Sequence, residues 1–310
     1  MSICLVTGGA GFIGSHLVEA LVAQGEQVRV LDNLSSGQQY NLAGVLKRIE
    51  YIEGDIRDEA IVQRAIAGID VVYHLAAMVS VPESMAKPLE AESINAAGTL
   101  HLLNVARAAG VRRLVLSSTS AVYGDEPTLP KTEAMPTQPQ SPYAISKLTA
   151  EAYCHLYTRA FGPETVVLRY FNVFGPRQDP ASPYSGVISI FVDRLGRGKA
   201  PLIFGDGEQT RDFVFVEDVV RANLLAAAVP AAAGQIFNVG TGRPVSINHL
   251  FEQLRRIFEC DLKPDYQPAR PGDIRYSYAD PSRAQAVLGW SAEVAFEDGL
   301  RRLVAAVGDG

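Results

Sequence analysis

The chain has 310 residues, of which 47% are hydrophobic and 20% are charged, as is typical of a globular protein with one large domain or two unequal ones. Its 28 basic and 34 acidic side chains give a net charge of −6, and no dense basic block is present to neutralise a nucleic-acid backbone. A nucleic-acid partner is therefore not expected. The apolar N-terminal run is broken by glycines before it could span a membrane and has no charged segment before it, so we expect neither a signal peptide nor a membrane anchor, and a cytoplasmic location.

The three cysteines, Cys4, Cys154 and Cys260, are odd in number, far apart and in apolar surroundings. They are expected to be buried thiols, with no disulfide framework and no metal site.

Short β-rich runs alternate with amphipathic stretches through the first part of the chain. In order they are 2–8, 12–24, 27–33, 49–55, 59–67, 70–77, 88–109 and 112–118. Because the β-rich runs are apolar throughout, they predict a doubly wound parallel sheet with helices on both faces.

A helix is predicted over about 142–161, beginning with Pro142, and a further strand over 164–172. From about 175 proline and glycine become frequent, and helices are expected near 217–229 and 246–259. We therefore expect a nucleotide-binding domain over 1–174, to which a later segment near 212–240 returns, and a smaller C-terminal α/β lobe over 175–310 that binds the substrate.

The stretch VTGGAGFIGSHL places Gly8, Gly11 and Gly14 between the first strand and a helix. Small residues there let backbone amides approach a pyrophosphate, which the positive end of the helix dipole attracts. Asp32 ends the second strand about eighteen residues after Gly14. A carboxylate at this position can accept hydrogen bonds from the ribose hydroxyls of NAD and repel the 2′-phosphate of NADP. The pattern predicts a Rossmann-type domain that binds NAD rather than NADP, with Asp55 at the next strand end as a receptor for the adenine amino group.

The stretch SPYAISK places Tyr143 and Lys147 on one face of the predicted helix. An ammonium near a phenol favours the phenolate and lowers the pKa of the tyrosine. Tyr143 is therefore a candidate general base near neutral pH.

The motifs TGGAGFIG, HLAA, SSTSAVYG, SPYAISK, LRYFNVFGPRQ, FGDGEQTRDFVFVED, NVG and RPGD occur in this order from Ser2 to about Trp290. Together they resemble the extended short-chain dehydrogenase/reductase family, and within it the UDP-glucose 4-epimerase group. The resemblance implies NAD contacts at Gly8, Gly11, Phe12, Ile13, Gly14, Asp32, Asn33, Gly37, Asp55, Ile56, Leu75, Ala76, Ala77, Asn95, Ser117, Tyr143, Lys147 and Tyr170. It implies substrate contacts at Ser80, Thr119, Tyr143, Asn172, Val187, Ile188, Leu202, Ile203, Phe204, Arg211, Arg270, Asp273 and Ser277.

The resemblance also implies a mechanism in which NAD oxidises a UDP-hexose at C4 and then reduces the ketose on its other face. Tyr143 would remove the 4-hydroxyl proton, Thr119 would hydrogen-bond the same oxygen, and Lys147 would hold the nicotinamide ribose. Family members that act as UDP-glucuronate decarboxylases or dTDP-glucose 4,6-dehydratases carry an acid two places after the position of Thr119. This chain has Ala121 there, which favours simple epimerisation.

The identity of the sugar depends on Ser277. In the family a tyrosine at this position goes with rejection of N-acetylated sugars, so a serine predicts use of both UDP-glucose and UDP-N-acetylglucosamine. Val79 counts against a strong N-acetyl preference, because several relatives with that preference have glycine there.

Alternatives remain open. They are a UDP-glucuronate 4-epimerase, decarboxylase or dehydratase of the same family, and a non-catalytic NAD-sensing module, which would be expected to have lost its Tyr/Lys pair. Homodimerisation through the helices near 88–109 and 142–161 is also implied, although covering the sheet would equally explain their apolar faces.

Overall fold

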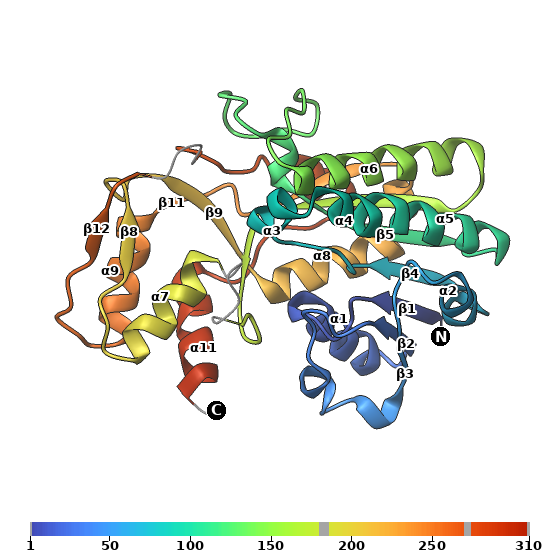
Figure 1. Ribbon diagram of the computed structural model, residues 1–310, viewed down its shortest axis with the longest axis horizontal. Helices are drawn as coiled ribbons and strands as arrows, with labels where there is room; N and C mark the ends of the chain where they lie inside the picture. Colours follow the sequence, from blue (N-terminus) through green and yellow to red (C-terminus); the bar gives the residue numbers. More distant parts are fainter. Residues whose placement is uncertain (1, 180–185, 270–273, 309–310) are drawn as a thin grey trace.

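In the computed structural model, which describes residues 2–179, 186–269 and 274–308, a parallel sheet forms the larger of two lobes (Figure 1). Its seven strands lie in the order β10-β6-β5-β4-β1-β2-β3. They are β1 (Ile3–Thr7), β2 (Gln27–Asp32), β3 (Ile49–Glu53), β4 (Val71–His74), β5 (Arg113–Thr119), β6 (Glu164–Tyr170) and β10 (Ile236–Val239). The strand order reverses between β1 and β4, and in open parallel sheets such a switch point is where a ligand binds.

Helices cover both faces of this sheet. One face packs on α1 (Phe12–Ala23), α8 (Val216–Ala228) and α10 (Ser282–Leu288), and the other on α2 (Glu59–Ile66), α5 (Gly98–Ala108) and α6 (Pro142–Ala160). Strand β1 shows why both faces need helices. Val6 packs in the apolar cluster on the α1 face, and its neighbour Leu5 packs in the cluster on the α5 face. Alternate side chains of a strand point to opposite faces, so an apolar run needs cover on both. The predicted fold class is confirmed.

The stretch predicted as one helix over 88–109 is divided. It consists of α4 (Pro88–Glu92), a π-helical turn over Ser93–Ala97, and α5, and it is preceded by α3 (Val81–Ala86). At the end of the π-helical turn, a Cβ added to Gly98 would lie 2.8 Å from Ile56 Cδ1. The wider turn and the glycine together bring this segment close to the residues that follow β3. A π-helical turn often marks a functional site.

The smaller lobe, at the left of Figure 1, has a three-stranded sheet of order β11-β9-β7 and a pair β12-β8. Its strands are β7 (Asn172–Phe174), β8 (Leu202–Phe204), β9 (Thr210–Phe215), β11 (Pro244–Ser246) and β12 (Asp265–Gln267). Its helices are α7 (Val187–Gly196), α9 (Ile247–Ile257) and α11 (Phe296–Gly308). Phe174 packs edge-on against Phe213, Phe215 and Phe296 at the centre of this lobe.

The predicted helices near 217–229 and 246–259 correspond to α8 and α9, whereas α7, α10 and α11 were not predicted, because they are separated by proline- and glycine-rich loops. Single 3₁₀ turns lie at Gln39–Leu42, Leu46–Arg48, Ser120–Tyr123 and Pro230–Ala232. Both α8 and β10 belong to the larger lobe, in the segment expected to return to it. The boundary at 174/175 stays a prediction.

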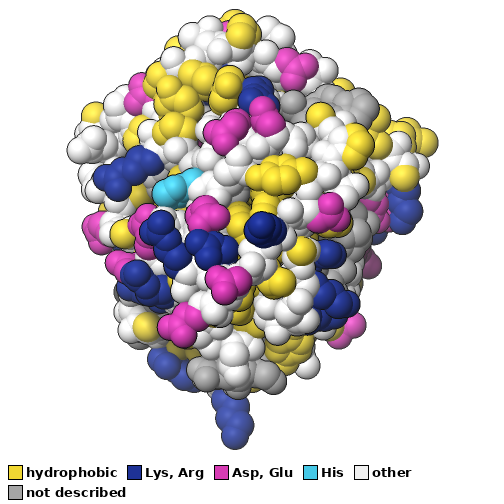
Figure 2. Space-filling view, turned by 90° about the vertical axis from the view of Figure 1, so that its left-hand side faces the viewer, with side chains coloured by type: hydrophobic (Ala, Val, Ile, Leu, Met, Phe, Trp, Pro, Cys, Tyr) yellow, Lys and Arg dark blue, Asp and Glu magenta, His cyan; other side chains and the backbone are white. Residues whose placement is uncertain are grey.

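Figure 2 shows the face of the molecule at the left of Figure 1, which the smaller lobe forms. Basic and acidic side chains are interspersed over it, and ion pairs such as Arg255–Glu252 and Arg275–Asp206 lie in this lobe. In the part of the chain that the structure describes, no helix is long and apolar enough to cross a membrane, and no cluster of metal-binding side chains is present.

The three cysteines differ in their surroundings. Cys4 and Cys154 are buried thiols, as predicted, whereas Cys260 is only partly buried because it follows the end of α9 at the surface. The prediction was therefore wrong for Cys260.

Candidate active site

The turn after β1 is shaped by its glycines. A Cβ added to Gly14 would lie 2.1 Å from Gly8 O, and one added to Gly8 would lie 2.6 Å from Ala76 N. Gly8 also has φ +71°, a value that side chains disfavour. The glycines at 8 and 14 therefore let the turn pack directly on the first turn of α1, whose amides have no intrahelical partners. A Cβ added to Gly11 would meet only Gly8 O, at 3.2 Å, so this side of the turn is open to a phosphate. The residues present fit the pyrophosphate of a dinucleotide.

Asp32 lies buried at the end of β2. Its two carboxylate oxygens accept hydrogen bonds from Ala10 N and Leu34 N, each at 2.9 Å. Burial raises its pKa, and the two backbone donors oppose the shift. A Cβ added to Gly37 would lie 2.9 Å from Asp32 Oδ1, so the glycine keeps this carboxylate open, as ribose binding requires.

Asp55 has more partners than the sequence suggests. Its carboxylate accepts from Arg57 N, Nε and Nη2 and from Asn33 Nδ2, at 2.7–2.9 Å. The hydrogen bonds from Arg57 lower the pKa of Asp55 to about 2. An adenine amino group would be a fifth donor to this carboxylate, and Arg57 is a neighbour that the sequence analysis missed.

A buried histidine joins β1, β4 and α5. His74 Nδ1 lies 2.7 Å from Thr7 Oγ1, and Nε2 lies 2.9 Å from Thr99 Oγ1. Because Thr99 donates its own proton to Asn95 O, it must accept from Nε2, so Nδ1 is the acceptor for Thr7. Burial, with the nearby Lys147 charge, lowers the pKa of His74 to about 3. The imidazole is therefore neutral and holds strands and helix together.

Asn95 lies in the π-helical turn with its side chain fully engaged. Its Oδ1 accepts from Met78 N at 2.8 Å, and its Nδ2 donates to Met78 O and to Ser146 Oγ, each at 3.0 Å. Ser146 Oγ in turn donates to Tyr143 O at 2.9 Å. Both amide hydrogens are thus donated within the protein. These bonds link the turn to α6, and the NAD contact of Asn95 stays a prediction.

The three predicted catalytic side chains gather where β5 ends and α6 begins. Lys147 Nζ donates to Ser117 O at 2.7 Å, and the Thr119 hydroxyl lies near enough to Tyr143 to influence the pKa of the tyrosine. Tyr143 N donates to Ser84 Oγ at 3.1 Å, so α3 also supports the tyrosine. The sequence analysis did not predict this contact. Lys147 is buried, whereas Tyr143 is half-buried.

The pKa values in this cluster differ from the simple expectation. Burial lowers the pKa of Lys147 to about 8, and Glu151 opposes the shift. Burial raises the pKa of Tyr143, and the nearby Thr119 hydroxyl opposes this shift. The expectation that Lys147 lowers the pKa of Tyr143 is therefore not met in this structure, because burial dominates and the group that favours the phenolate is the Thr119 hydroxyl.

The neighbouring hydroxyls have distinct partners. Ser118 Oγ donates to Glu151 Oε1 at 2.5 Å beneath the site, and Ser80 Oγ accepts from Glu83 N at 2.9 Å to cap α3. Tyr170 OH and the Asn223 amide hydrogen-bond to each other at 2.8–3.0 Å. Both hydroxyls have partners within the protein, and the predicted contacts of Ser80 with the substrate and of Tyr170 with NAD stay predictions. The remaining predicted cofactor contacts lie in the first turn of α1 or just after β3 and β4: Phe12, Ile13, Ile56, Leu75, Ala76 and Ala77.

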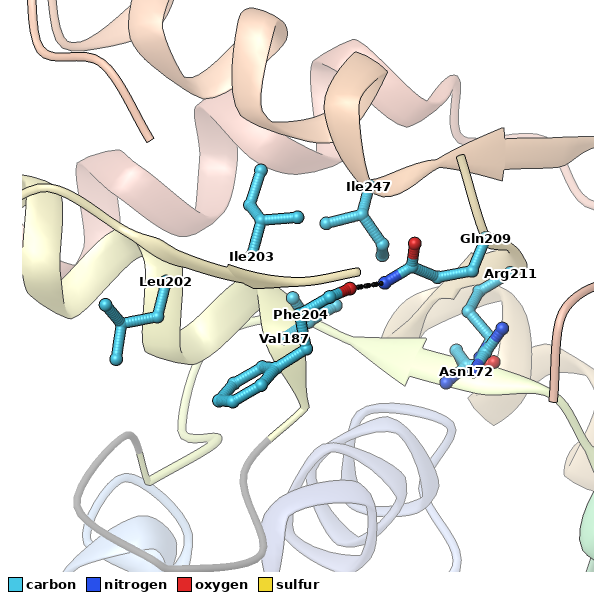
Figure 3. Close-up of a pocket in the computed structure, with 8 residues that line it drawn as sticks. All are labelled: Asn172, Val187, Leu202, Ile203, Phe204, Gln209, Arg211 and Ile247. Atoms are coloured by element: carbon cyan, nitrogen blue, oxygen red, sulfur yellow. Dashed lines mark hydrogen bonds between the residues drawn. The ribbon is translucent and has the colours of Figure 1, made fainter. Parts of the chain in front are cut away.

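A pocket of about 210 Å³ opens in the smaller lobe (Figure 3). Its lining is Asn172, Val187, Leu202, Ile203, Phe204, Gln209, Arg211 and Ile247. Six of these were predicted substrate contacts, and Ile188, the seventh in this region, lines an adjoining hollow. The volume is below that of typical pockets for drug-sized ligands, so this pocket can hold one part of a nucleotide sugar.

Two lining residues, Gln209 and Ile247, were missed by the sequence analysis. Gln209 Nε2 donates to Phe204 O at 2.8 Å, which joins the start of β9 to the end of β8 (Figure 3). Gln209 and Arg211 are two residues apart and so lie on one face of the strand, which could have indicated Gln209 as a pocket residue. Ile247 comes from a distant segment and carries no such signal.

A buried carboxylate holds the strand of Arg211 in place. Asp212 accepts hydrogen bonds from Thr241 N, Thr241 Oγ1, Gly242 N and Ala279 N, at 2.6–3.0 Å. Two residues before Ala279, Ser277 N donates to Thr210 O at 3.2 Å. Ser277 therefore lies beside the strand that carries Arg211. Arg270 and Asp273 lie outside the described residues.

The arrangement matches known proteins. The model of the NAD dependent epimerase/dehydratase family matches residues 4–240. The chain belongs to this family. NAD is its cofactor, as predicted, and the resemblance drawn from the motifs is confirmed.

Individual relatives cover nearly the whole chain. It is 43% identical to the UDP-glucose 4-epimerase of Mycolicibacterium smegmatis over 305 residues, 97% of this chain and 96% of the relative. The UDP-glucose 4-epimerase of Thermotoga maritima, solved with UDP-glucose, is 42% identical with a TM-score of 0.95 over 99% of both chains. The UDP-N-acetylglucosamine 4-epimerase of Methanobrevibacter ruminantium, solved with UDP-N-acetylmuramic acid, is 39% identical with a TM-score of 0.95 over 99% and 98%. A UDP-glucuronate 4-epimerase of Thermodesulfobacterium geofontis is 35% identical over 98% and 95%.

The glycine turn gives a direct test of cofactor binding. In Gly14→Ala the new methyl group collides with the Gly8 carbonyl, so the turn must shift, and we expect NAD affinity to fall about tenfold or more, which corresponds to ~1.4 kcal/mol. The measurement is the NAD released on denaturing the purified protein, with isothermal titration of NAD into stripped protein. Gly44→Ala is the control, because the nearest atom to its added Cβ is Glu19 Oε1 at 3.9 Å. Equal NAD retention by both variants would contradict the assignment.

Proposed function

We propose that the protein is a UDP-hexose 4-epimerase that interconverts UDP-glucose and UDP-galactose through a 4-keto intermediate, with NAD tightly bound. The observation that carries the proposal is the cluster of Tyr143, Thr119 and Lys147 at the end of β5. Thr119 pairs across the sheet with Tyr170, two residues before Asn172 in the pocket of about 210 Å³. The cluster is thus within reach of the sugar of a ligand whose nucleotide occupies that pocket. The names of the relatives support the same reaction.

The protein's own residues divide the work as follows. NAD, when bound, would supply the acceptor and donor of the hydride at C4 of the sugar. Tyr143 removes the proton of the 4-hydroxyl and returns it to the same oxygen, which Thr119 hydrogen-bonds throughout. Lys147 contributes a positive charge beside the nicotinamide ribose. The guanidinium of Arg211 suits the pyrophosphate, because its fork of donors matches phosphate oxygens.

The 3₁₀ turn after β5 supports epimerisation over elimination. Ala121 N donates to Thr119 Oγ1 at 3.1 Å and so helps to orient the threonine, while its methyl side chain can neither give nor take a proton. Dehydration and decarboxylation need a further acid or base at the sugar. With alanine at this position, the proposed reaction ends at inversion of C4.

A decisive assay uses the purified protein without added cofactor. We expect conversion of UDP-galactose to UDP-glucose, detected by chromatography, and a fall in kcat of about 10²–10⁴-fold in Tyr143→Phe, the range typical of a lost general acid or base. Tyr153→Phe, which loses a hydroxyl on the same helix, is the control. UDP-glucuronate and dTDP-glucose are tested in parallel for the alternative reactions. Failure to convert UDP-galactose even with added NAD would overturn the proposal.

We further propose that N-acetylated sugars are accepted. Ser277 is small and half-buried beside β9, where a larger side chain would take up space next to the substrate pocket. A structure of a UDP-N-acetylglucosamine 4-epimerase is among the most similar found.

Substitution of this serine tests the size argument. In Ser277→Tyr we expect kcat/KM for UDP-N-acetylgalactosamine to fall by about 10-fold or more, within the range for a filled pocket, while that for UDP-galactose stays within about twofold. Ser277→Ala should keep both substrates. Parallel losses for the two sugars in the tyrosine variant would show that position 277 does not select by size.

We also propose a homodimer through the outer surfaces of α4 and α6, which pack against each other (Figure 1). These two helices carry large exposed apolar side chains, Leu89 (86% exposed) on α4 and Ile145 (50%) and Leu156 (47%) on α6. Apolar side chains gathered on adjacent helices favour association.

Charges on this surface should dissociate the dimer. For the double variant Leu89→Glu/Ile145→Glu we expect the mass of one chain by size exclusion with light scattering, and the mass of two chains for the parent. Val307→Glu, at a 52% exposed position on α11, should remain dimeric. A parent protein with the mass of one chain would refute the proposal.

A further inference from the structure

A buried ion pair lies directly beneath the candidate active site. Glu151 and Arg169 are 3% and 4% exposed, with Arg169 Nη2 2.6 Å from Glu151 Oε2 and Nε 3.0 Å from Oε1. Ser118 Oγ donates to the same carboxylate at 2.5 Å. The Arg169 guanidinium also lies 4.9 Å from the centre of the Tyr123 ring. Burying two charges costs free energy, yet none of the proposed catalytic steps uses this pair.

The pair is built into the same two elements that hold Lys147. Ser118 and Arg169 are cross-strand partners in β5 and β6, and both donate to Glu151 on α6. One residue before Ser118, the carbonyl of Ser117 accepts from Lys147 Nζ at 2.7 Å. Glu151 follows Lys147 by one helical turn, so the two side chains lie on the same side of α6. Two consecutive residues of β5 thus engage two consecutive turns of α6.

We propose that Glu151 is a positioning residue for Lys147: held by Ser118 and Arg169, it fixes the register of α6 on β5 and places a negative charge one turn from the ammonium, so that Lys147 remains a cation although buried. This inference rests on the proposed function, in which Lys147 acts as a cation beside the cofactor ribose.

The other titratable side chains that face Lys147 are uncharged, so Glu151 is its counter-charge. On α6, burial raises the pKa of the Cys154 thiol, so that side chain is uncharged. From β4, His74 is neutral, since burial lowers its pKa to about 3. From β5, the Ser117 carbonyl contributes a dipole. Among the described residues, Glu151 is therefore the anion that opposes the loss of the proton from Lys147.

The test is Glu151→Gln, which keeps the shape and removes the charge. Without the nearby anion, Lys147 should lose its proton at lower pH, by about one pH unit for an opposite charge at this range. We expect the alkaline limb of the kcat profile to move down by that amount, and the Lys147 signal to titrate at correspondingly lower pH in NMR of ¹³C-lysine-labelled protein. Loss of the signal in Lys147→Arg assigns it.

Two further variants keep the test decisive. Glu151→Gln/Arg169→Met removes both charges and should fold even if an unpaired arginine destabilises the single variant. It should lower the pKa of Lys147 by a smaller amount, because loss of the Arg169 cation offsets part of the loss of the Glu151 anion. Glu164→Gln breaks the Arg113–Glu164 ion pair at the opposite end of β5 and β6 and should leave the pH profile and the lysine titration in place.

An unchanged titration of Lys147 in the folded double variant would overturn the inference and leave Glu151 as structural support alone. The NMR readout does not depend on epimerase activity. If the parent protein had no epimerase activity, the proposed function would be refuted, and the titration of Lys147 would still decide the role of Glu151.

Discussion

The hydrogen bond from the Lys147 ammonium to the Ser117 carbonyl, 2.7 Å long, joins α6 to the carboxyl end of β5. Lys147 is buried, and a buried ammonium is stable only where dipoles and counter-charges replace water. The carbonyl and Glu151 provide that replacement. Since Tyr143 lies one turn before Lys147 on the same helix, the position of the tyrosine relative to Thr119 follows from the same contact. The geometry of the whole candidate site is therefore set by how α6 sits on β5.

Around this contact, the parallel sheet collects residues from distant parts of the chain. The carboxyl ends of parallel strands share one edge, so the glycine turn after β1, Asp32 after β2 and Thr119 at the end of β5 face the same side. The second lobe lies at that edge because β7 follows β6 after a single residue and α8 follows β9 directly. These direct connections hold the pocket that Asn172 and Arg211 line next to the sheet.

Several polar residues in this region support the site from within. His74, Asn95 and Asp212 are buried, and the hydrogen bonds of each join segments far apart in the sequence. The motif resemblance predicts Asn95 and Tyr170 as cofactor contacts, and in this structure their polar side-chain atoms bond to Ser146 and Asn223. A motif reports that a residue type recurs at a position. It does not distinguish a ligand contact from a buried polar group that must find a partner inside the protein.

The sequence by itself determined the doubly wound sheet, the glycine turn with Asp32, and the pairing of Tyr143 with Lys147 on one helix, because these depend on local periodicity and on spacings of a few residues. It also indicated six of the eight pocket residues through family motifs. Only the tertiary structure decided the division of the 88–109 helix by a π-helical turn, the contribution of Gln209 and Ile247 to the pocket, and the pKa of Tyr143. Each of these depends on packing between segments distant in the chain, and burial, which outweighs the expected effect of Lys147 on the tyrosine, exists only once those segments have come together.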